Sequence, residues 1–383
     1  MSDQLSVLVL TYTTFAREPR ALKQARYLQE KHHVTTAGFG PAPLENVDHL
    51  QLAAQPAQRW GALGRVLHLA SLGLRLHRFI TRLSARDREV LGELGSRSWD
   101  IVIAHDLWCL EAALSLKPRL GVVLDLHEYA PGEASHSLAW RLVMKPYVEW
   151  LLRKKMPLAA HVVTVGEGIA ERYRVEYGQH STVVTNATPY HDLSASEVGS
   201  PIRLVHSGVA APERSLGRLI EAVIETPANV SLDFYLVDNG SGELERLRAL
   251  AEGRKNITFN DPVPYEELVQ TLNTYDVGLS VFPPVTFNLE WCLPNKFFDF
   301  IQARLAMVVG PSPEMARVVR EHSLGVVLDD FESATLARVL ERMEPRQVQE
   351  WKQNASDRAQ YLSSERQMDA WELIVNDLLT RPN

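Results

Sequence analysis

The chain has 383 residues, which is long for a single hydrophobic core, so two domains are expected. Its content of 45% hydrophobic and 23% charged residues is typical of a globular protein and excludes a disordered or collagen-like chain. The N-terminus lacks the basic start and the apolar run of a signal peptide, and no uncharged apolar stretch approaches the roughly 18 residues of a membrane span. The two cysteines form no metal-spaced or redox pair, so the cytosol is the expected location.

The net charge of −7 is unevenly distributed along the chain. Residues 1–193 carry 22 basic against 19 acidic side chains, and residues 194–383 carry 18 against 28. This asymmetry suggests two domains that serve different partners. The basic residues are too dispersed for a nucleic-acid footprint, so we expect no nucleic-acid partner.

The first half of the chain reads as short strands that alternate with helical stretches. Most of the strands are continuous apolar runs, as in buried parallel sheets, which predicts a doubly wound α/β domain. The predicted strands are residues 6–12, 33–40, 49–54, 100–106, 121–128, 161–167 and 181–187.

The same alternation restarts after a small, polar segment that ends in proline, residues 194–201, which we interpret as a linker. The second set of predicted strands is 202–208, 231–238, 257–261, 277–283, 306–310 and 324–329. We therefore predict two Rossmann-like domains, at 1–193 and 202–360, with a C-terminal helix at 361–383 that packs back on the N-terminal domain. Ligands bind beyond the carboxyl ends of such strands, so the active site is expected in a cleft between the two domains.

Polar residues follow two neighbouring strands in the first domain. His105 and Asp106 end one strand, and His127 and Glu128 end the next. These side chains are candidates for contact with a substrate hydroxyl. A histidine or an acid at a strand end is also often only structural, and the spacing alone does not decide between the two.

Three turns of the second domain have features of a phosphate or nucleotide site. Gly208 opens a small-residue turn before Arg214, where backbone amides and a guanidinium could hold an anion. Asp238 and Asn239 begin a glycine-rich turn, and Pro262 with Val263 forms a stiff loop that could border a flat base. Each feature, taken alone, also fits an ordinary turn.

The stretch "CLPNKFFDFIQARLAMVVG" gives the sharpest signal. Pro294 suits a helix start, and Lys296 and Asp299 then lie one turn apart on one face. A cation at the positive end of a helix dipole implies an anionic partner such as phosphate, and Asp299 could accept hydrogen bonds from ribose hydroxyls. A local Lys–Asp pair is the alternative.

This stretch resembles the "LPNK-LFEY-x-A-x-G-x-P-V-V" signature of retaining GT-B glycosyltransferases of family four. Other segments resemble the same family in the same order along nearly the whole chain. They are "FAREPRALKQARYLQEKHHVTT", "DIVIAHDLWCLEAAL", "VVLDLHEY", "HVVTVGEGIAERYRVEYG" with "VVTNATPY", and "HSGVAAPERSLGRLIEAV".

The resemblance implies a GT-B fold and the transfer of a sugar from a nucleotide-sugar donor to a glycan, lipid-linked or small-molecule hydroxyl. It implies that Arg214 holds the diphosphate and Asp299 the ribose, with Asn295 and Lys296 facing the phosphates. Gly208, Asp238, Asn239, Pro262, Val263 and Glu290 complete the expected donor site. His105, Asp106, His127, Glu128 and Arg20 are expected on the acceptor side.

The implied chemistry retains anomeric configuration, with Arg214, Lys296 and His127 as the catalytic candidates and no dedicated protein base. The chain has no Asp-x-Asp triplet, so we expect no metal and no other cofactor. Four positions depart from the family pattern. Asp299 replaces a glutamate, Trp291 replaces the family's first glutamate, Val209 replaces a basic residue, and Thr11–Phe15 replaces a glycine-rich loop.

Two alternative functions remain open. The first is a sugar-nucleotide epimerase of the same fold, which would need carboxylates and a histidine around the donor sugar. The second is a degenerate nucleotide-binding subunit that assembles with an active partner, for which Trp291 and Val209 are the supporting features.

An anionic membrane surface is a further candidate partner. Arg59–Arg86 holds six arginines and no acid, and the pattern predicts one helical face of apolar residues flanked by arginines. That face comprises Leu69, Leu72, Leu76, Phe79 and Leu83, between Arg75, Arg78, Arg82 and Arg86. Residues 140–157 add a second basic, aromatic-rich segment, and the alternative is a helix packed on the sheet with solvated arginines.

Overall fold

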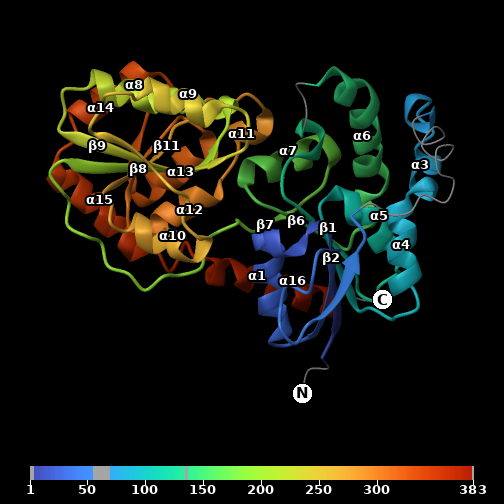
Figure 1. The fold of residues 1–383 in the computed structure, drawn as a ribbon. Helices are drawn as coiled ribbons and strands as arrows, with labels where there is room; N and C mark the ends of the chain where they lie inside the picture. The colour runs from blue at the N-terminus through green and yellow to red at the C-terminus, as the bar shows by residue number, and fades with distance from the viewer. Residues whose placement is uncertain (1–3, 55–69, 134–136, 382–383) are drawn as a thin grey trace. The chain divides into compact units, whose positions relative to one another are not determined.

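The computed structural model describes residues 4–54, 70–133 and 137–381. The chain forms two compact units (Figure 1). Unit 1 comprises Met1–Val184 and Met368–Asn383, and unit 2 comprises Thr185–Gln367. The division falls at Val184, before the predicted boundary at residue 193, so the crossover segment that follows Val184 belongs to unit 2. The last residues of the chain return to unit 1.

Unit 1 is built on a sheet of seven parallel strands in the order β3-β2-β1-β4-β5-β6-β7, which confirms the predicted doubly wound domain. The central strands β1, β4 and β5 are almost wholly buried, which explains why they read as continuous apolar runs. The strands are β1 (Ser6–Thr14), β2 (His33–Phe39), β3 (Asp48–Leu52), β4 (Ile101–His105), β5 (Gly121–Leu126), β6 (His161–Thr164) and β7 (Thr182–Val183).

Helices cover this sheet, and one core cluster joins β1 to α1 and to the C-terminal helix α16. Trp371 of α16 is 1% exposed within that cluster, so the end of the chain is an integral part of unit 1. The α-helices of the unit are α1 (Pro19–Gln29), α3 (His77–Leu83), α4 (Ala85–Leu94), α5 (Leu110–Ser115), α6 (Lys145–Lys154), α7 (Glu167–Tyr177) and most of α16 (Ser364–Thr380).

Unit 2 repeats the architecture with six parallel strands in the order β10-β9-β8-β11-β12-β13. Every strand predicted from the sequence of this half is present. The strands are β8 (Ile202–Ala210), β9 (Val230–Asp238), β10 (Ile257–Asn260), β11 (Val277–Ser280), β12 (Ala306–Val309) and β13 (Gly325–Val327).

Two helical layers enclose the sheet of unit 2, with α8, α9 and α14 on one side and α10, α12 and α15 on the other (Figure 1). Successive residues of β8 alternate between the layers, since Leu204 packs in the first cluster and Val205 in the second. The helices are α8 (Gly217–Glu225), α9 (Glu243–Leu250), α10 (Tyr265–Leu272), α11 (Phe287–Glu290), α12 (Asn295–Gln302), α13 (Pro313–His322), α14 (Ser333–Glu341) and α15 (Pro345–Arg358).

Strand order reverses between β1 and β4 in unit 1 and between β8 and β11 in unit 2. In doubly wound sheets, ligands bind outside the carboxyl ends of the strands at such reversals. The segments that follow these four strands, together with their neighbours in each sheet, are therefore where functional side chains are expected.

Candidate functional site

In unit 2, two cations meet beside the turn that follows β8. The Arg214 guanidinium lies 4.7 Å from the centre of the Phe282 ring, and the Lys296 ammonium lies 6.0 Å from the same ring. Gly208, with φ 147°, makes room for the lysine, because a Cβ at this position would come within 2.7 Å of Lys296 Nζ. Three residues predicted from two separate motifs therefore lie close together.

No carboxylate among the described residues forms an ion pair with either cation. Arg214 Nη1 is buried and has no hydrogen-bond partner in the part of the chain that the structure describes. A buried donor without a partner costs about 1–3 kcal/mol, and more when it is charged. Two like charges held together in this way define a site that favours an anion.

The surroundings of Lys296 disfavour its charged form. Burial, and next the Arg214 charge, lowers the pKa of Lys296 to about 7. Its ammonium lies 3.1 Å from Nε2 of His206, a wholly buried histidine in β8. An anion bound here would reverse this shift, because it would favour the charged form of the lysine.

The start of α12 brings the remaining motif residues together. Pro294 occupies the N-cap position, one residue before the position expected from the sequence, and Asn295 begins the helix. The Asn295 side chain is exposed and accepts a hydrogen bond from Asn186 Nδ2 at 2.8 Å. Asp299 is only 3% exposed, and its Oδ1 accepts a hydrogen bond from Thr188 Oγ1 at 2.6 Å.

The other expected donor residues lie on the surface of the same unit. The side chains of Asp238 and Asn239 accept hydrogen bonds from the backbone of Gly240 and Ser241, so they shape their own turn. Pro262 and Glu290 are exposed, and Val263 is partly buried. Two of the positions that differ from the family pattern also lie in this unit. Trp291 stacks on Phe287 with ring centres 6.0 Å apart, and Val209 is 46% exposed.

In unit 1, the structure brings the predicted histidines into direct contact. His105 Nδ1 lies 2.9 Å from His127 Nε2, and His105 Nε2 lies 2.9 Å from Gln24 Oε1. Burial lowers the pKa of His105 to about 3, so its ring is neutral and one of its nitrogens must accept a hydrogen bond. Glu128 follows His127 in the chain, and its backbone carbonyl accepts a hydrogen bond from the Tyr173 hydroxyl at 2.9 Å.

Carboxylates surround the partly exposed His127. Its Nδ1 lies 3.8 Å from Glu18 Oε1 and 3.7 Å from Asp106 Oδ2, and its backbone N–H donates to Asp106 Oδ1. Burial, and next the nearby Asp106, raises the pKa of Glu133, while burial is also the main cause of a raised pKa at Glu18. Asp106 has φ 65°, a conformation that a non-glycine residue adopts only under constraint and that is common at functional sites.

Arg20 lies in the interior rather than at this surface. It is 3% exposed, donates to both oxygens of Asp125 at 2.8 and 2.7 Å, and donates to the carbonyl of Val184. Burial alone would raise the pKa of Asp125, but Arg20 and the two histidines hold it below its ordinary value. Arg20 therefore supports Asp125, and through it the end of β5, rather than offering a surface to a ligand.

His105, Asp125 and His127 place their ligand atoms within 4.8 Å of one another, as a metal site would require. These atoms are already engaged, because Arg20 takes both oxygens of Asp125 and the His105 ring bonds His127 and Gln24. A divalent ion here would lie beside a buried guanidinium, which opposes cation binding. The donor set fits a hydrogen-bonded network around the Arg20–Asp125 ion pair better than it fits a metal.

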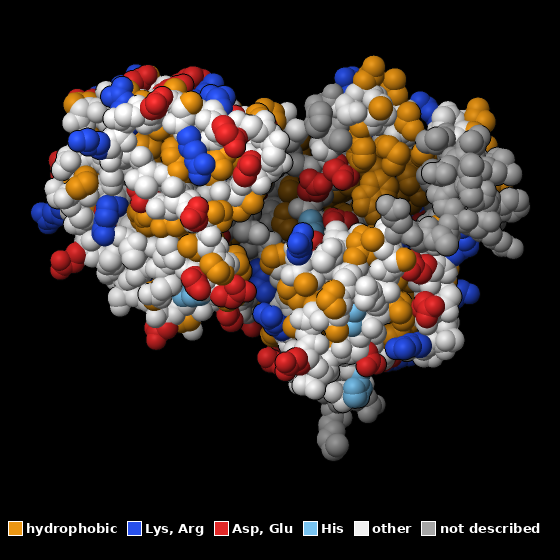
Figure 2. Space-filling model, in the orientation of Figure 1, with side chains coloured by type: hydrophobic (Ala, Val, Ile, Leu, Met, Phe, Trp, Pro, Cys, Tyr) orange, Lys and Arg blue, Asp and Glu red, His pale blue; other side chains and the backbone are white. Residues whose placement is uncertain are grey.

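Hydrophobic side chains gather over α6 of unit 1, in a hollow visible in Figure 2. Tyr147 and Trp150 of α6 stack with ring centres 6.1 Å apart, and Trp108, just after β4, lies 6.5 Å from Tyr147. Trp140 completes the group, and its buried Nε1 has no hydrogen-bond partner within residues 4–54, 70–133 and 137–381. Part of the aromatic segment 140–157 therefore packs inside unit 1.

The predicted continuous basic helix is wrong. The helix that includes residues 70–73 ends in a turn at Arg75, which has φ 57°, and α3 begins only at His77. Leu72 is buried, whereas Leu76 and Phe79 are 45% and 56% exposed, so these residues share no single face. The stretch from Arg59 to Leu69 and the side chains of Arg82 and Leu83 lie outside the described residues.

Arg86 is also unavailable to a lipid surface. Its guanidinium donates to the carbonyls of Ala53 and Ala54 and lies 4.4 Å from the centre of the Phe39 ring. Leu74 remains 71% exposed in the turn before α3, and Leu138 and Leu142 are 64% and 65% exposed before α6. Among the described residues, none of the helices has the length and hydrophobicity needed to cross a bilayer.

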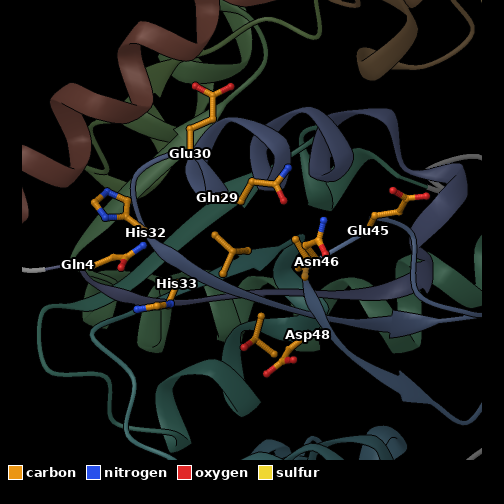
Figure 3. A pocket seen from close by; sticks show the side chains of 11 residues that line it. Gln4, Gln29, Glu30, His32, His33, Glu45, Asn46 and Asp48 are labelled. Atoms are coloured by element: carbon orange, nitrogen blue, oxygen red, sulfur yellow. The ribbon is translucent and has the colours of Figure 1, made fainter.

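A polar pocket of about 660 Å³ lies at the opposite end of the unit 1 sheet (Figure 3). It is lined by residues at the starts of β2 and β3, including His33 and Asp48, and by Glu30 and Glu45. None of the predicted site residues lines it. Its place at the amino ends of the strands separates it from the sites described above.

Sequence reasoning missed the residues that support the predicted ones. Glu18, Gln24, Asp125 and Phe282 were not assigned to the site, although the chain brings each into it. His206 was also missed, and its signal was a single histidine within the apolar run of β8, two residues before the glycine turn. A buried polar residue in such a strand needs a partner, and that partner is Lys296.

Two consecutive doubly wound units, with candidate residues at the carboxyl ends of their strands, define the GT-B class of glycosyltransferase fold. Residues 18–189 match the family model described as Glycosyltransferase Family 4, which confirms the resemblance over that part of the chain. No curated protein sequence matches the chain.

Solved structures agree on the fold over almost the whole chain. HepE of Anabaena, crystallised with UDP, has a TM-score of 0.71 at 12% identity and covers 97% of this chain and 100% of its own. Sucrose-phosphate synthase of Thermosynechococcus elongatus has a TM-score of 0.71 at 12% identity, covering 98% and 99%. WaaG, a glycosyltransferase involved in lipopolysaccharide biosynthesis, has a TM-score of 0.65 at 15% identity, covering 95% and 99%. Identities this low establish the fold alone.

Proposed function

We propose that this protein is a retaining glycosyltransferase that moves a sugar from a nucleotide-diphosphate donor to an acceptor hydroxyl without a metal ion. The observation that carries the proposal is the pairing of Arg214 and Lys296 over Phe282, with no carboxylate partner among the described residues. A diphosphate supplies the missing negative charge, and its departure from the sugar is the charge-forming event that preorganised cations stabilise.

UDP is the first nucleotide to test. HepE was crystallised with UDP and with UDP-glucose. In this chain, the Gly208 turn and the start of α12 supply the phosphate side of a donor site, and we propose that Asp299 receives the ribose. Glu290 and the loop at Pro262 and Val263 would border the sugar and the base.

The acceptor hydroxyl is proposed to bind in unit 1 near His127. Retention follows if the bond from C1 to the diphosphate oxygen breaks while the acceptor oxygen bonds C1 from the same face. The acceptor proton then passes to the departing phosphate oxygen, so the reaction balances without a protein base. His127 can orient the hydroxyl, because its ring contacts His105, which is held in turn by Gln24.

The test is a thermal-stability titration of the pure protein with UDP, GDP, ADP, dTDP and CMP in EDTA. A ligand present at a hundred times its dissociation constant stabilises the native state by about 2.7 kcal/mol, a visible shift. One nucleotide that stabilises the protein without metal, followed by detection of a glycosylated acceptor by mass spectrometry, supports the proposal. Stabilisation by none of the five, or stabilisation only after a divalent ion is added, contradicts it.

The epimerase alternative is favoured by one observation, the cluster of Glu18, Asp106 and His127 in unit 1. Incubation of the sugar nucleotide alone distinguishes an epimerase from a glycosyltransferase, because an epimerase converts the sugar nucleotide to its epimer without an acceptor. The degenerate-subunit alternative rests on Trp291 and Val209 and predicts nucleotide binding without any product.

We further propose that unit 1 contacts an anionic membrane surface through the exposed Leu74, Leu76 and Phe79, beside the exposed Arg75. Co-sedimentation with vesicles that contain phosphatidylserine should exceed that with neutral vesicles. Replacement of Leu74 and Phe79 by serine should abolish the difference. Replacement of Leu373, an equally exposed leucine on α16, is the matched control.

A further inference from the structure

His206 has a proton arrangement that its surroundings fix. Its Nδ1 lies 2.7 Å from the carbonyl oxygen of Leu279, and a carbonyl can only accept, so the proton is on Nδ1. Burial, and next the neighbouring Lys296 charge, lowers the pKa of His206 well below its ordinary value. The ring is therefore neutral, and Nε2 carries a lone pair that points toward Lys296.

Lys296 completes this arrangement as a donor. An ammonium has only donors, so the 3.1 Å contact is a hydrogen bond from Nζ to Nε2 of His206. Phe282 lies beneath the ammonium, and the absence of a side chain at Gly208 leaves the space that Nζ occupies. The lysine is thus held at a fixed place by a strand residue that sequence motifs did not mark.

We propose that His206 is a positioning residue that holds the Lys296 ammonium in place for a diphosphate, so that binding of the diphosphate depends on the protonation state of Lys296. This inference rests on the proposed donor function of unit 2. It adds a residue to that site and a linkage between nucleotide affinity and pH.

The direction of the linkage follows from the charges around Lys296. His206 on β8, Arg214 after β8, Cys292 before α12 and Asp299 on α12 are the titratable or charged groups that act on it. Burial raises the pKa of Cys292 to about 11 and lowers the pKa of His206 well below its ordinary value, so neither of these two groups changes charge where Lys296 does.

In the free protein Lys296 loses its proton as the pH rises through about 7, whereas a bound diphosphate favours the charged form. Affinity is therefore highest below that pH and falls by up to about tenfold per pH unit above it. The terminal phosphate of a nucleoside diphosphate titrates near pH 6, so between pH 6.5 and 9 it becomes only slightly more negative, and this change cannot cause the loss of affinity.

A matched pair of substitutions isolates the contact. His206→Gln keeps an amide that can place an acceptor where Nε2 lies, whereas His206→Leu keeps neither an acceptor nor a donor. The two variants therefore differ at Lys296. In His206→Leu the ammonium loses its acceptor, so the pH at which UDP affinity falls moves downward, and affinity at pH 7.5 drops about tenfold relative to His206→Gln.

The experiment measures two quantities on the full chain. UDP affinity is measured by calorimetry from pH 6.5 to 9 in the wild type, both position-206 variants and Lys296→Gln, which should show a flat profile. Without ligand, the rate at which acetic anhydride labels Lys296 is followed by mass spectrometry across the same pH range. Equal midpoints in His206→Gln and His206→Leu, or a wild-type labelling rate that shows no midpoint up to pH 9, would overturn the role of His206.

The two measurements distinguish this inference from the donor assignment. If labelling shows the expected midpoints and UDP, GDP, ADP, dTDP and CMP all fail to bind, His206 still positions Lys296, and it is the nucleotide-donor function that fails. In that case inorganic pyrophosphate, titrated in the same way, must bind with the predicted pH dependence. Failure of pyrophosphate as well contradicts the proposed diphosphate linkage.

Discussion

The two units each bury a neutral histidine near the point where strand order reverses, and they use it differently. His105 ends β4 of unit 1 at 1% exposure, and His206 lies in β8 of unit 2 at 0%. His105 contacts a second histidine, whereas His206 contacts a lysine. In both units a buried imidazole therefore fixes the position of a more exposed side chain, but the two side chains belong to different kinds of site.

The groups in front of the two histidines have opposite charges. In unit 2 the cations Lys296 and Arg214 stand without an ion-pairing carboxylate among the described residues, which suits an anion. In unit 1 the carboxylates of Glu18 and Asp106 lie around His127, which suits hydroxyl groups that need acceptors. We therefore expect unit 2 to bind the leaving diphosphate and unit 1 to orient the attacking hydroxyl.

The largest effect is expected from Arg214, whose buried Nη1 has no hydrogen-bond partner among the described residues. Arg214→Ala should reduce UDP affinity by more than 100-fold, because a charged contact to the diphosphate is worth several kcal/mol when desolvated. Calorimetry with UDP measures this. Arg248→Ala removes another arginine that lies over an aromatic ring of the same unit, Phe259, and should leave affinity unchanged. Full UDP affinity in Arg214→Ala would end the assignment of unit 2 as the donor site.

The unit 1 histidine should affect transfer and not nucleotide binding. His127→Ala is expected to lower the rate of sugar transfer about 100-fold while UDP affinity stays within twofold, since a positioned hydrogen-bonding group acts on the reacting hydroxyl. His180→Ala replaces an exposed histidine of the same unit and serves as the control. A normal transfer rate in His127→Ala would show that the His105–His127 pair has a structural role only.

The fold could be predicted almost completely from the sequence because parallel strands are marked by their own composition. Strands such as β4 and β12 are buried on both faces and read as apolar runs, and each of the thirteen runs predicted to be a strand became one. The break in the basic segment before α4 could not be predicted. The apolar spacing of this segment fits a helix, but Arg75 adopts a left-handed conformation that breaks it, and nothing local in the sequence marks that break.

The site could be predicted only where residues belong to motifs. Arg214 and Lys296 lie on different elements that their motifs place at one end of the sheet, so their meeting was expected. Gln24 and His206 act through contacts with residues that are distant in sequence, and no local pattern specifies such a pair. The interior position of Arg20 was missed for the same reason, since its partner Asp125 lies 105 positions away.

Asp299 offers the smallest and most discriminating test of unit 2. It is 3% exposed and already accepts a hydrogen bond from Thr188, so a ribose can gain only part of its hydrogen-bonding capacity. Asp299→Asn should weaken UDP binding about tenfold, which is the value of one hydrogen bond to a charged group. The same substitution should leave the binding of inorganic pyrophosphate unchanged, because pyrophosphate has no ribose. Thr188→Val keeps the carboxylate and removes this one hydrogen bond, so it should lower the free energy of unfolding by about 1 kcal/mol with little effect on UDP affinity. Equal losses for UDP and pyrophosphate in Asp299→Asn would mean that the carboxylate acts by holding the Thr188 crossover segment in place and that the ribose is bound elsewhere.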